Sequence, residues 1–256
     1  MARRDDNLQT RLDRDLAELK LPEIAKGYRE VLDEAARKGT SMLEVLATLI
    51  GMEQAARQQR ALQRRLREAR LPKQKTLTEY VFSFPKQIPK AMILRLFDCD
   101  FIQQHGCAVL IGPTGTGKSH LLTALGYTAA ERGHSVRHTR VVDMINHLTM
   151  AQIKGVLGNT LRSYVRPSLL LLDELGYLPI DKRGADLLFQ VVAARYETGS
   201  IVLTTNRPFR EWGTLFDTDN TLATALIDRL MHHGEAIVIQ GDSYRMKDKD
   251  SDSTSA

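Results

Sequence analysis

Cysteine is scarce in this sequence, and long apolar runs are missing from it. The 256 residues include two cysteines, Cys99 and Cys107, whose spacing is not that of metal ligands. Neither a disulfide scaffold nor a cysteine zinc site is therefore expected, and both thiols are predicted to be reduced. No apolar run approaches the roughly 20 residues of a membrane span, and no apolar segment follows the basic start as a secretory signal would require. We expect a cytoplasmic protein without a membrane partner.

What is present is an ordinary globular composition with an uneven charge. Hydrophobic residues make up 43% and charged residues 26% of the chain, which suits one α/β domain with a small appendage. The net charge of +5 is small. Residues 57–75, however, carry one acid, Glu68, against eight basic residues: Arg57, Arg60, Arg64, Arg65, Arg67, Arg70, Lys73 and Lys75. Such a run is either a solvated helix face or a contact for a polyanion, and we favour the polyanion.

Residues 1–72 are predicted to form a helical N-terminal domain of three helices. Ser41 and Glu44 have the spacing of a capping box that opens the third helix, which continues into the basic run and ends near Pro72. Gly39 is expected to stop the second helix. Apolar residues at helical spacing form the expected core: Leu8, Leu12, Leu16 and Leu19, then Ile24, Tyr28, Val31, Leu32 and Ala35, then Met42, Leu43, Leu46 and Ile50.

Residues 73–90 are interpreted as a linker, and residues 247–256 as a disordered polar tail. Within the linker, Tyr80, Phe82 and Phe84 alternate with other residues. Two interpretations stay open for these aromatics, a strand edge or an anchor on the following domain.

Residues 91–246 alternate between short apolar runs and helical segments. Strands are expected near 108–111, 135–139, 168–172, 200–204 and 236–240. This alternation is typical of a parallel sheet covered by helices on both faces. The longer stretch between the second and third strands predicts two helices around Gly155 to Gly158.

One segment between an apolar run and a helix has the complete Walker A pattern: Gly112, Pro113, Thr114, Gly115, Thr116, Gly117, Lys118 and Ser119. Its glycines allow backbone N–H groups to surround phosphate oxygens, and the helix that follows directs its positive end at the same anion. Lys118 is expected to reach the β- and γ-phosphates and Ser119 to ligate Mg²⁺. A plain glycine turn is the alternative, but a nucleoside triphosphate site is the better interpretation.

A second motif, Leu169 to Glu174, is a Walker B pattern, in which an apolar strand delivers two carboxylates. Asp173 is predicted to hold Mg²⁺, and Glu174 to act as general base on the attacking water. An apolar run before Asp-Glu is common by itself. About 55 residues after a Walker A motif, it predicts an ATPase rather than a small-molecule kinase.

Two further residues extend the predicted site. Asn206 ends another apolar strand, where it could orient water and the γ-phosphate or serve only as a turn residue before Arg207-Pro208. Arg229 lies on a helix before the last strand and could be a surface ion pair or an arginine finger for a neighbouring subunit. His232 and His233 have no third ligand at helical spacing, so we interpret them as surface residues.

These motifs together resemble the IstB family, the AAA+ helper ATPases of insertion-sequence transposition, which are related to the DnaC and DnaI helicase loaders. The segments that carry the resemblance are Gly112–Leu121, Leu171–Tyr177, Thr204–Phe209, Ile227–Leu230 and Gly241–Arg245. The resemblance implies an AAA+ strand order of 5-1-4-3-2, an initiator-type helical insertion after the second strand, and ATP and Mg²⁺ as cofactors. It places His120 beside the nucleotide. No helical lid is expected, because only 16 residues follow the predicted fifth strand. A lid arginine that touches the nucleotide of its own subunit is therefore missing, unless Arg245 takes its place.

The resemblance also implies self-assembly on double-stranded DNA with ATP, and stimulation of a partner transposase. Lys154 and Arg162 in the insertion would join Arg57, Arg60, Arg64, Arg65, Arg67 and Arg70 in contacting the DNA backbone, with Arg140 and Arg166 nearby. A replicative helicase loader of the DnaC/DnaI type is the alternative function. A small-molecule phosphotransferase is disfavoured by Glu174.

Overall fold

The computed structural model describes residues 2–84, 87–216 and 219–244, with side chains from residue 8 onward. The chain divides into two compact units, Met1–Arg64 and Arg65–Ala256. Within the described residues, the structure contains no helix with the length and apolar character that a bilayer crossing requires.

The first unit is built from three helices, as predicted: α1 (Ala2–Glu18), α2 (Pro22–Lys38) and α3 (Met42–Ala69), of which α3 continues past the unit boundary. Gly39 ends α2 in the left-handed conformation, with φ of 68°. The predicted capping box is present: the Ser41 amide donates to Glu44 Oε2 at 2.9 Å, and the Glu44 amide donates to Ser41 Oγ at 3.3 Å. Local sequence therefore sets where these helices begin and end.

The core of this unit is smaller than the apolar pattern predicted. Its buried residues are Leu16, Tyr28, Val45 and Leu49. The prediction that the first part of α3 is core through Met42, Leu43, Leu46 and Ile50 is wrong, because these four side chains are 51–78% exposed. Leu8, Leu12, Leu19 and Leu32 are likewise exposed. In the three-helix unit, α3 packs with the face that carries Val45 and Leu49, and its second apolar face stays outside the core.

The second unit contains a five-stranded parallel sheet in the order β2-β3-β4-β1-β5. Read from the other edge, this is the predicted order 5-1-4-3-2. The strands are β1 (Cys107–Ile111), β2 (Val136–Arg140), β3 (Leu169–Leu175), β4 (Ser200–Thr205) and β5 (Gly234–Val238). The three central strands, β1, β3 and β4, are almost entirely buried, as expected for a sheet with both faces covered.

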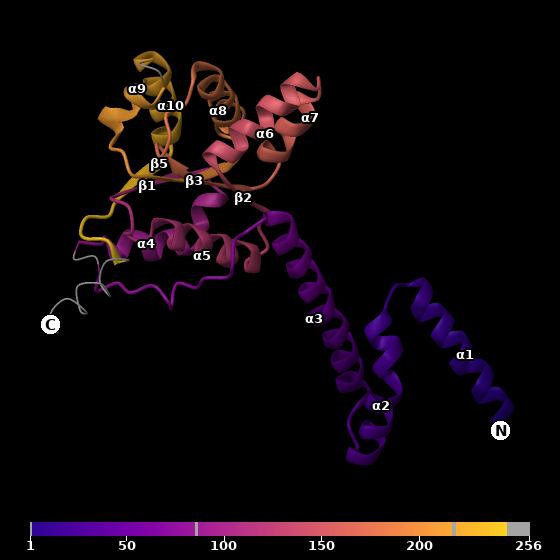
Figure 1. Ribbon diagram of the computed structural model, residues 1–256. Coiled ribbons are helices and arrows are strands. Elements are labelled where there is room, and N and C mark those ends of the chain that lie inside the picture. Colours follow the sequence, from indigo (N-terminus) through magenta and orange to yellow (C-terminus); the bar gives the residue numbers. More distant parts are fainter. Residues whose placement is uncertain (1, 85–86, 217–218, 245–256) are drawn as a thin grey trace, which may run out of the picture. The chain divides into compact units, whose positions relative to one another are not determined.

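Helices cover both faces of this sheet. Figure 1 shows α4 (Lys90–Phe97) and α5 (Lys118–Glu131) on one face and the helices that follow α5 in the chain on the other. Those on the second face are α6 (Val141–Ile153), α7 (Leu157–Val165), α8 (Lys182–Arg195), α9 (Trp212–Leu215) and α10 (Asn220–His232). Short 3₁₀ turns, η1 (Asp100–Ile102) and η2 (Phe209–Glu211), precede β1 and α9. The helices α6 and α7 are the predicted pair between the second and third strands.

A buried arginine, Arg195 at the end of α8, organises the amino-terminal end of the sheet. Its side chain is fully buried, and its two terminal nitrogens donate to five backbone carbonyls at 2.7–3.1 Å. These carbonyls belong to Tyr164, Val165, Pro167, Ser168 and Ser200. Burial lowers the pKa of Arg195 to about 10, so the group remains charged at neutral pH. It thereby joins the end of α7 to the starts of β3 and β4.

We expect Arg195→Leu to lower the free energy of unfolding by about 3 kcal/mol or more, because several buried carbonyls would lose their donor. Arg195→Lys should also destabilise, since an ammonium has three donors. Urea unfolding followed by fluorescence of the single tryptophan, the buried Trp212, reports on this unit. The control is Arg183→Leu, which removes an exposed arginine of the same helix and should change stability by less than about 0.5 kcal/mol. Equal effects of the two leucine variants would contradict the assigned role.

Candidate functional site

A cleft of about 310 Å³ lies in the second unit, at the end of the sheet where β1, β3 and β4 finish. Its size is within the range of small-molecule sites. The cleft is lined by residues of five segments: Lys75, Glu79, Tyr80, Val81 and Phe84; Thr114 to His120; Glu174 and Tyr177; Thr204, Thr205 and Asn206; and Tyr244. The structure thus brings the two Walker motifs and Asn206 together.

The loop of residues 112–117 connects β1 to α5 through two glycines in the left-handed conformation, Gly115 and Gly117, with φ of 85° and 86°. Gly115 also permits a close approach, because a Cβ there would lie 2.0 Å from Ser243 Oγ. Helix α5 begins at Lys118. This loop therefore combines the backbone geometry and the helix N-terminus that bind phosphate groups.

Lys118 is held at the base of this loop. Its side chain is 9% exposed, and Nζ donates to the carbonyl oxygens of Gly112 and Pro113 at 2.7 Å each. These contacts keep the ammonium beside the loop whose amides would bind phosphate. The contact of Lys118 with the β- and γ-phosphates stays a prediction.

One carboxylate oxygen, Asp173 Oδ1, connects the two Walker motifs. Ser119 Oγ donates to it at 3.0 Å, and Thr204 Oγ1 donates to it as well. The Thr204 hydroxyl in turn accepts from the Glu174 amide at 2.9 Å. Sequence reasoning missed Thr204, although it stands two residues before Asn206 in the same apolar run. Asp173 is buried, so its oxygen is fixed with respect to both α5 and β4.

Glu174 differs from Asp173 in exposure and in backbone conformation. It has φ of 64°, rare for a residue other than glycine, and the register between β3 and β4 shifts between Leu172 and Leu175. This irregularity gives two adjacent residues different environments: Asp173 is buried, whereas Glu174 is exposed and lines the cleft. Two neighbouring carboxylates can therefore have separate tasks.

Asn206 follows β4 and lines the same cleft. Its Oδ1 is close to the backbone of the turn after β3, since a Cβ on Gly176 would lie 3.4 Å from that oxygen. The structure places Asn206 beside the Walker motifs, and its action on water or phosphate stays a prediction.

Of the linker aromatics, Tyr80 anchors on the loop of residues 112–117, and residues 77–84 form turns rather than a strand edge. The Tyr80 hydroxyl donates to the Thr116 carbonyl at 3.0 Å, and its ring lies against Gly117, where a Cβ would be 2.5 Å from Cε2. Burial raises the pKa of Tyr80 to about 12. Phe84 packs edge-on against Tyr244 with ring centroids 5.5 Å apart. Tyr80 and Tyr244 were not predicted as site residues.

His120 lines the cleft, but its side chain makes a polar contact with Thr76 of the linker. Its Nε2 lies 2.8 Å from the Thr76 carbonyl oxygen, and its ring packs against that of Tyr80. The geometry thus connects the start of α5 to the segment that precedes the core.

Arg229 is not among the residues that line the cleft. It lies in the last turn of α10, with its guanidinium 4.6 Å from the ring centroid of Phe189 and Nη1 donating to the Ala225 carbonyl at 3.1 Å. Among the described residues no ion pair involves Arg229, so the surface ion-pair alternative is not observed. Helix α10 ends just before β5 begins. It therefore ends at the amino-terminal end of the parallel strands, whereas the cleft lies at their carboxyl-terminal end.

The predicted DNA-binding arginines fall into two groups. Three have partners within the protein: Arg57 and Arg60 pair with the buried Glu53 at 3.1 Å each, and Arg65 donates to the Ala130 carbonyl at 2.9 Å. Arg57 and Arg60 are nevertheless exposed, as are the other residues proposed to contact DNA: Arg64, Arg67, Arg70, Lys154 and Arg162. Arg245 lies outside the described residues.

Comparisons with known proteins agree on one family. The family described as IstB-like ATP binding protein matches residues 14–252. The ATP-binding protein of insertion sequence IS21 from Pseudomonas aeruginosa is 37% identical over 234 residues, which cover 91% of this chain and 88% of that protein.

Two solved structures show the same fold. One is DnaI, with a TM-score of 0.55 and 19% identity over 66% of this chain and 90% of that one. The other is AMPPCP-bound DnaA from Aquifex aeolicus, with a TM-score of 0.56 and 20% identity over 73% of this chain. The present chain spans 56% of the DnaA structure's length. These likenesses support the AAA+ P-loop fold.

We expect Lys118→Met to weaken ATP binding by at least about tenfold, because hydrogen bonds to charged groups contribute about 1.5–3 kcal/mol each. The exposed Lys182, at the start of α8, provides the matched control Lys182→Met. Titration calorimetry with ATP measures both affinities, and far-ultraviolet circular dichroism checks that the fold is retained. Equal ATP affinities in the two variants would show that Lys118 does not contact the phosphates.

Proposed function

The chain belongs to the family of IstB-like ATP-binding proteins, and from this membership and its site we propose that it is an ATPase helper of DNA transposition. It would oligomerise on target double-stranded DNA with ATP, remodel that DNA, and deliver it to a partner transposase. The observation that carries the enzymatic part is that Ser119 and Glu174 line one cleft, with the buried Asp173 accepting from Ser119 Oγ directly beside it. The relative from insertion sequence IS21 supports the transposition part.

The residues present fit a magnesium ion. Ser119 Oγ and Asp173 Oδ1 lie 3.0 Å apart at the Walker A helix, and both are the hard oxygen ligands that Mg²⁺ prefers. Mg²⁺ takes few protein ligands and completes its shell with waters and phosphate oxygens. When bound, the ion would neutralise charge on the β- and γ-phosphates. Thr204, which donates to Asp173 Oδ1, would keep this oxygen in place when the ion binds.

The proposed reaction is hydrolysis of ATP to ADP and phosphate. The oxygen of a water molecule attacks the γ-phosphorus, Glu174 accepts the water's proton, and the bond from the γ-phosphorus to the bridging oxygen of ADP breaks. Lys118 would balance the charge on the β- and γ-phosphates, and Asn206 would orient the water. Phe84 and Tyr244, which line the cleft and pack edge-on against each other, would supply aromatic surface for the nucleoside.

Arg229 is proposed to act on the nucleotide of a neighbouring subunit. Two observations support this: it does not line its own cleft, and it lies in the helix that precedes β5. A guanidinium supplied in trans would stabilise charge that develops on the γ-phosphate. Nucleotide held between two subunits would also favour oligomers.

The proposed DNA contact rests on the exposed cations of the basic run and of α6 and α7. Arg64, Arg67 and Arg70 are exposed; Arg57 and Arg60 are exposed too but pair with Glu53, and Arg65 donates to the Ala130 carbonyl. Lysine and arginine side chains of this kind bind phosphates without reading bases. We therefore propose binding that is nearly independent of DNA sequence.

A helicase loader remains the second candidate, because the fold is shared with DnaI. The DnaI likeness is at 19% identity and supports the fold alone, whereas a protein from an insertion sequence is 37% identical over most of the chain. The transposition helper is therefore the better-supported proposal.

For hydrolysis, we expect Glu174→Gln to keep ATP binding and to lower the turnover rate by about 10²–10⁴-fold, because the general base is lost. Arg229→Ala should likewise bind ATP and hydrolyse it on the order of 10³-fold more slowly. A mixture of the two variants with DNA should regain part of the activity, since some interfaces would pair an intact Glu174 with an intact Arg229. The rate of phosphate release is measured for each variant alone and for the mixture.

The mixing experiment has two informative failures. If mixed oligomers form and the mixture stays as inactive as either variant alone, Arg229 does not act in trans. If Glu174→Gln releases phosphate as fast as the unmodified protein, the general base has been assigned to the wrong residue.

For DNA, we expect the triple change of Arg64, Arg67 and Arg70 to Ala to weaken duplex binding. The slope of log affinity against log salt should flatten by about one unit for each phosphate that the variant no longer neutralises. Fluorescence anisotropy with a labelled duplex at several salt concentrations measures both quantities.

The matched control removes three exposed arginines of the first unit that lie outside the basic run, and so changes the net charge equally. These are Arg11, Arg14 and Arg37, each changed to Ala. If both triple variants lose the same affinity, the effect is one of net charge. The basic run would then be no specific DNA contact.

A further inference from the structure

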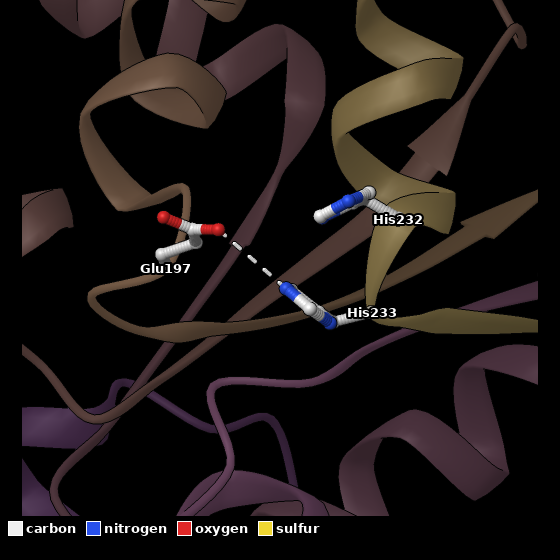
Figure 2. A group of neighbouring side chains, drawn as sticks. All are labelled: Glu197, His232 and His233. Atoms are coloured by element: carbon white, nitrogen blue, oxygen red, sulfur yellow. Dashed lines mark ion pairs between the residues drawn. The ribbon is translucent and has the colours of Figure 1, made fainter.

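Three side chains from two helix ends lie together on the surface of the second unit, opposite the nucleotide cleft. Glu197 follows α8, and His232 and His233 are at the end of α10. Figure 2 shows the carboxylate and both imidazoles on neighbouring segments. One ligand atom from each residue lies within 4.8 Å of the other two. A carboxylate and two imidazoles at this separation have the composition of a metal site.

The helix end explains why sequence spacing did not indicate this cluster. Consecutive residues in a helix point about 100° apart, so adjacent histidines within a helix do not share a metal ion. Helix α10 ends at His232, and His233 leaves the helical conformation with φ of −121° and ψ of 35°. The two ring centroids are therefore only 4.2 Å apart. The third ligand comes from a segment 35 positions earlier in the sequence, which no local pattern connects to them.

We propose that Glu197, His232 and His233 form a binding site for a zinc ion. In a tetrahedral zinc site with bonds of about 2.0–2.1 Å, ligand atoms lie about 3.3 Å apart. His233 Nε2 and Glu197 Oε1 are 3.6 Å apart, and the three ligand atoms lie within 4.8 Å of one another, so side-chain rotations would bring them to this spacing. Two histidines and one glutamate suit zinc, and a water molecule would take the fourth position.

The surroundings already hold these ligands in place. The Tyr196 hydroxyl lies 2.9 Å from His232 Nδ1, and such an outer contact fixes the tautomer and orientation of a metal-binding histidine. Glu197 has φ of 57° in a turn closed by the Gly199 amide, which donates to the Arg195 carbonyl at 3.0 Å. The His233 carbonyl accepts from the Cys107 amide at 3.0 Å. Backbone order thus lowers the entropy cost of assembling the site.

Bound zinc would cross-link the ends of α8 and α10. Arg229 lies one turn before His232, and its guanidinium packs on Phe189 of α8. Fixing the two helices would retain Arg229 against Phe189 and so slow turnover. This consequence rests on the proposed role of Arg229 in trans, whereas the zinc site does not.

Titration calorimetry of the full chain with zinc chloride tests the site, with excess Mg²⁺ present to compete at Ser119 and Asp173. We expect one zinc ion per chain. Binding should weaken at least about tenfold in Glu197→Gln and in the double variant His232→Asn, His233→Asn, since even outer contacts of a metal site change affinity about 10–100-fold. Glu131→Gln, which changes an exposed glutamate at the end of α5, is the matched control and should bind zinc normally.

Two results would overturn the site. One is zinc affinity that is unchanged in the double histidine variant while Trp212 fluorescence shows a retained fold. The other is binding that survives in Glu197→Gln but is lost in Cys107→Ser, because Cys107 lines a small cavity beside Glu197 and His233. Zinc that binds as expected without slowing ATP hydrolysis would leave the site intact and would remove only its consequence for Arg229.

Discussion

Three elements of the nucleotide-binding core meet at a single oxygen atom, Asp173 Oδ1. The hydroxyl at the start of α5 and the hydroxyl near the end of β4 both donate to it, so a helix and two strands are fixed by one acceptor. At the opposite end of the sheet the roles are reversed, because one donor group, the Arg195 guanidinium, binds five backbone carbonyls. The sheet is thus fastened at both ends by buried polar contacts, and the apolar strands between them supply the packing. Replacing either group would leave buried partners without a bond, which is the costly case for polar groups.

Much of the fold could be predicted from sequence because the relevant signals are local. A capping box spans four residues, a glycine that ends a helix acts on its own turn, and each buried strand is one apolar run. The Walker motifs are equally local, since the loop of residues 112–119 and the strand that ends in Asp173 each carry their chemistry within a few positions. The strand order came from the family resemblance, and it too is confirmed.

The contacts that could not be predicted join positions far apart in the chain. Thr204 bonds to Asp173 across 31 positions and Tyr80 to Thr116 across 36, and neither pairing has a sequence signature. In the helical unit, the sequence did not predict which apolar face is buried. Periodicity marks an apolar face but not whether another element covers it, so Leu43 and Leu46 were assigned to a core that Val45 and Leu49 form. Charge patterns are ambiguous in the same way, because Arg57 and Arg64 look alike until Glu53 is seen beside only one of them.

The anchoring of Tyr80 on the phosphate loop has a mechanical meaning. The segment that follows the basic helix contacts the start of α5 through Thr76 and the loop through Tyr80 before the chain continues to β1. Tension applied along this segment would be shared among the contacts of Arg65 with Ala130, of His120 with Thr76 and of Tyr80 with Thr116. The part borne by Tyr80 would reach the loop of residues 112–117 without passing through the sheet.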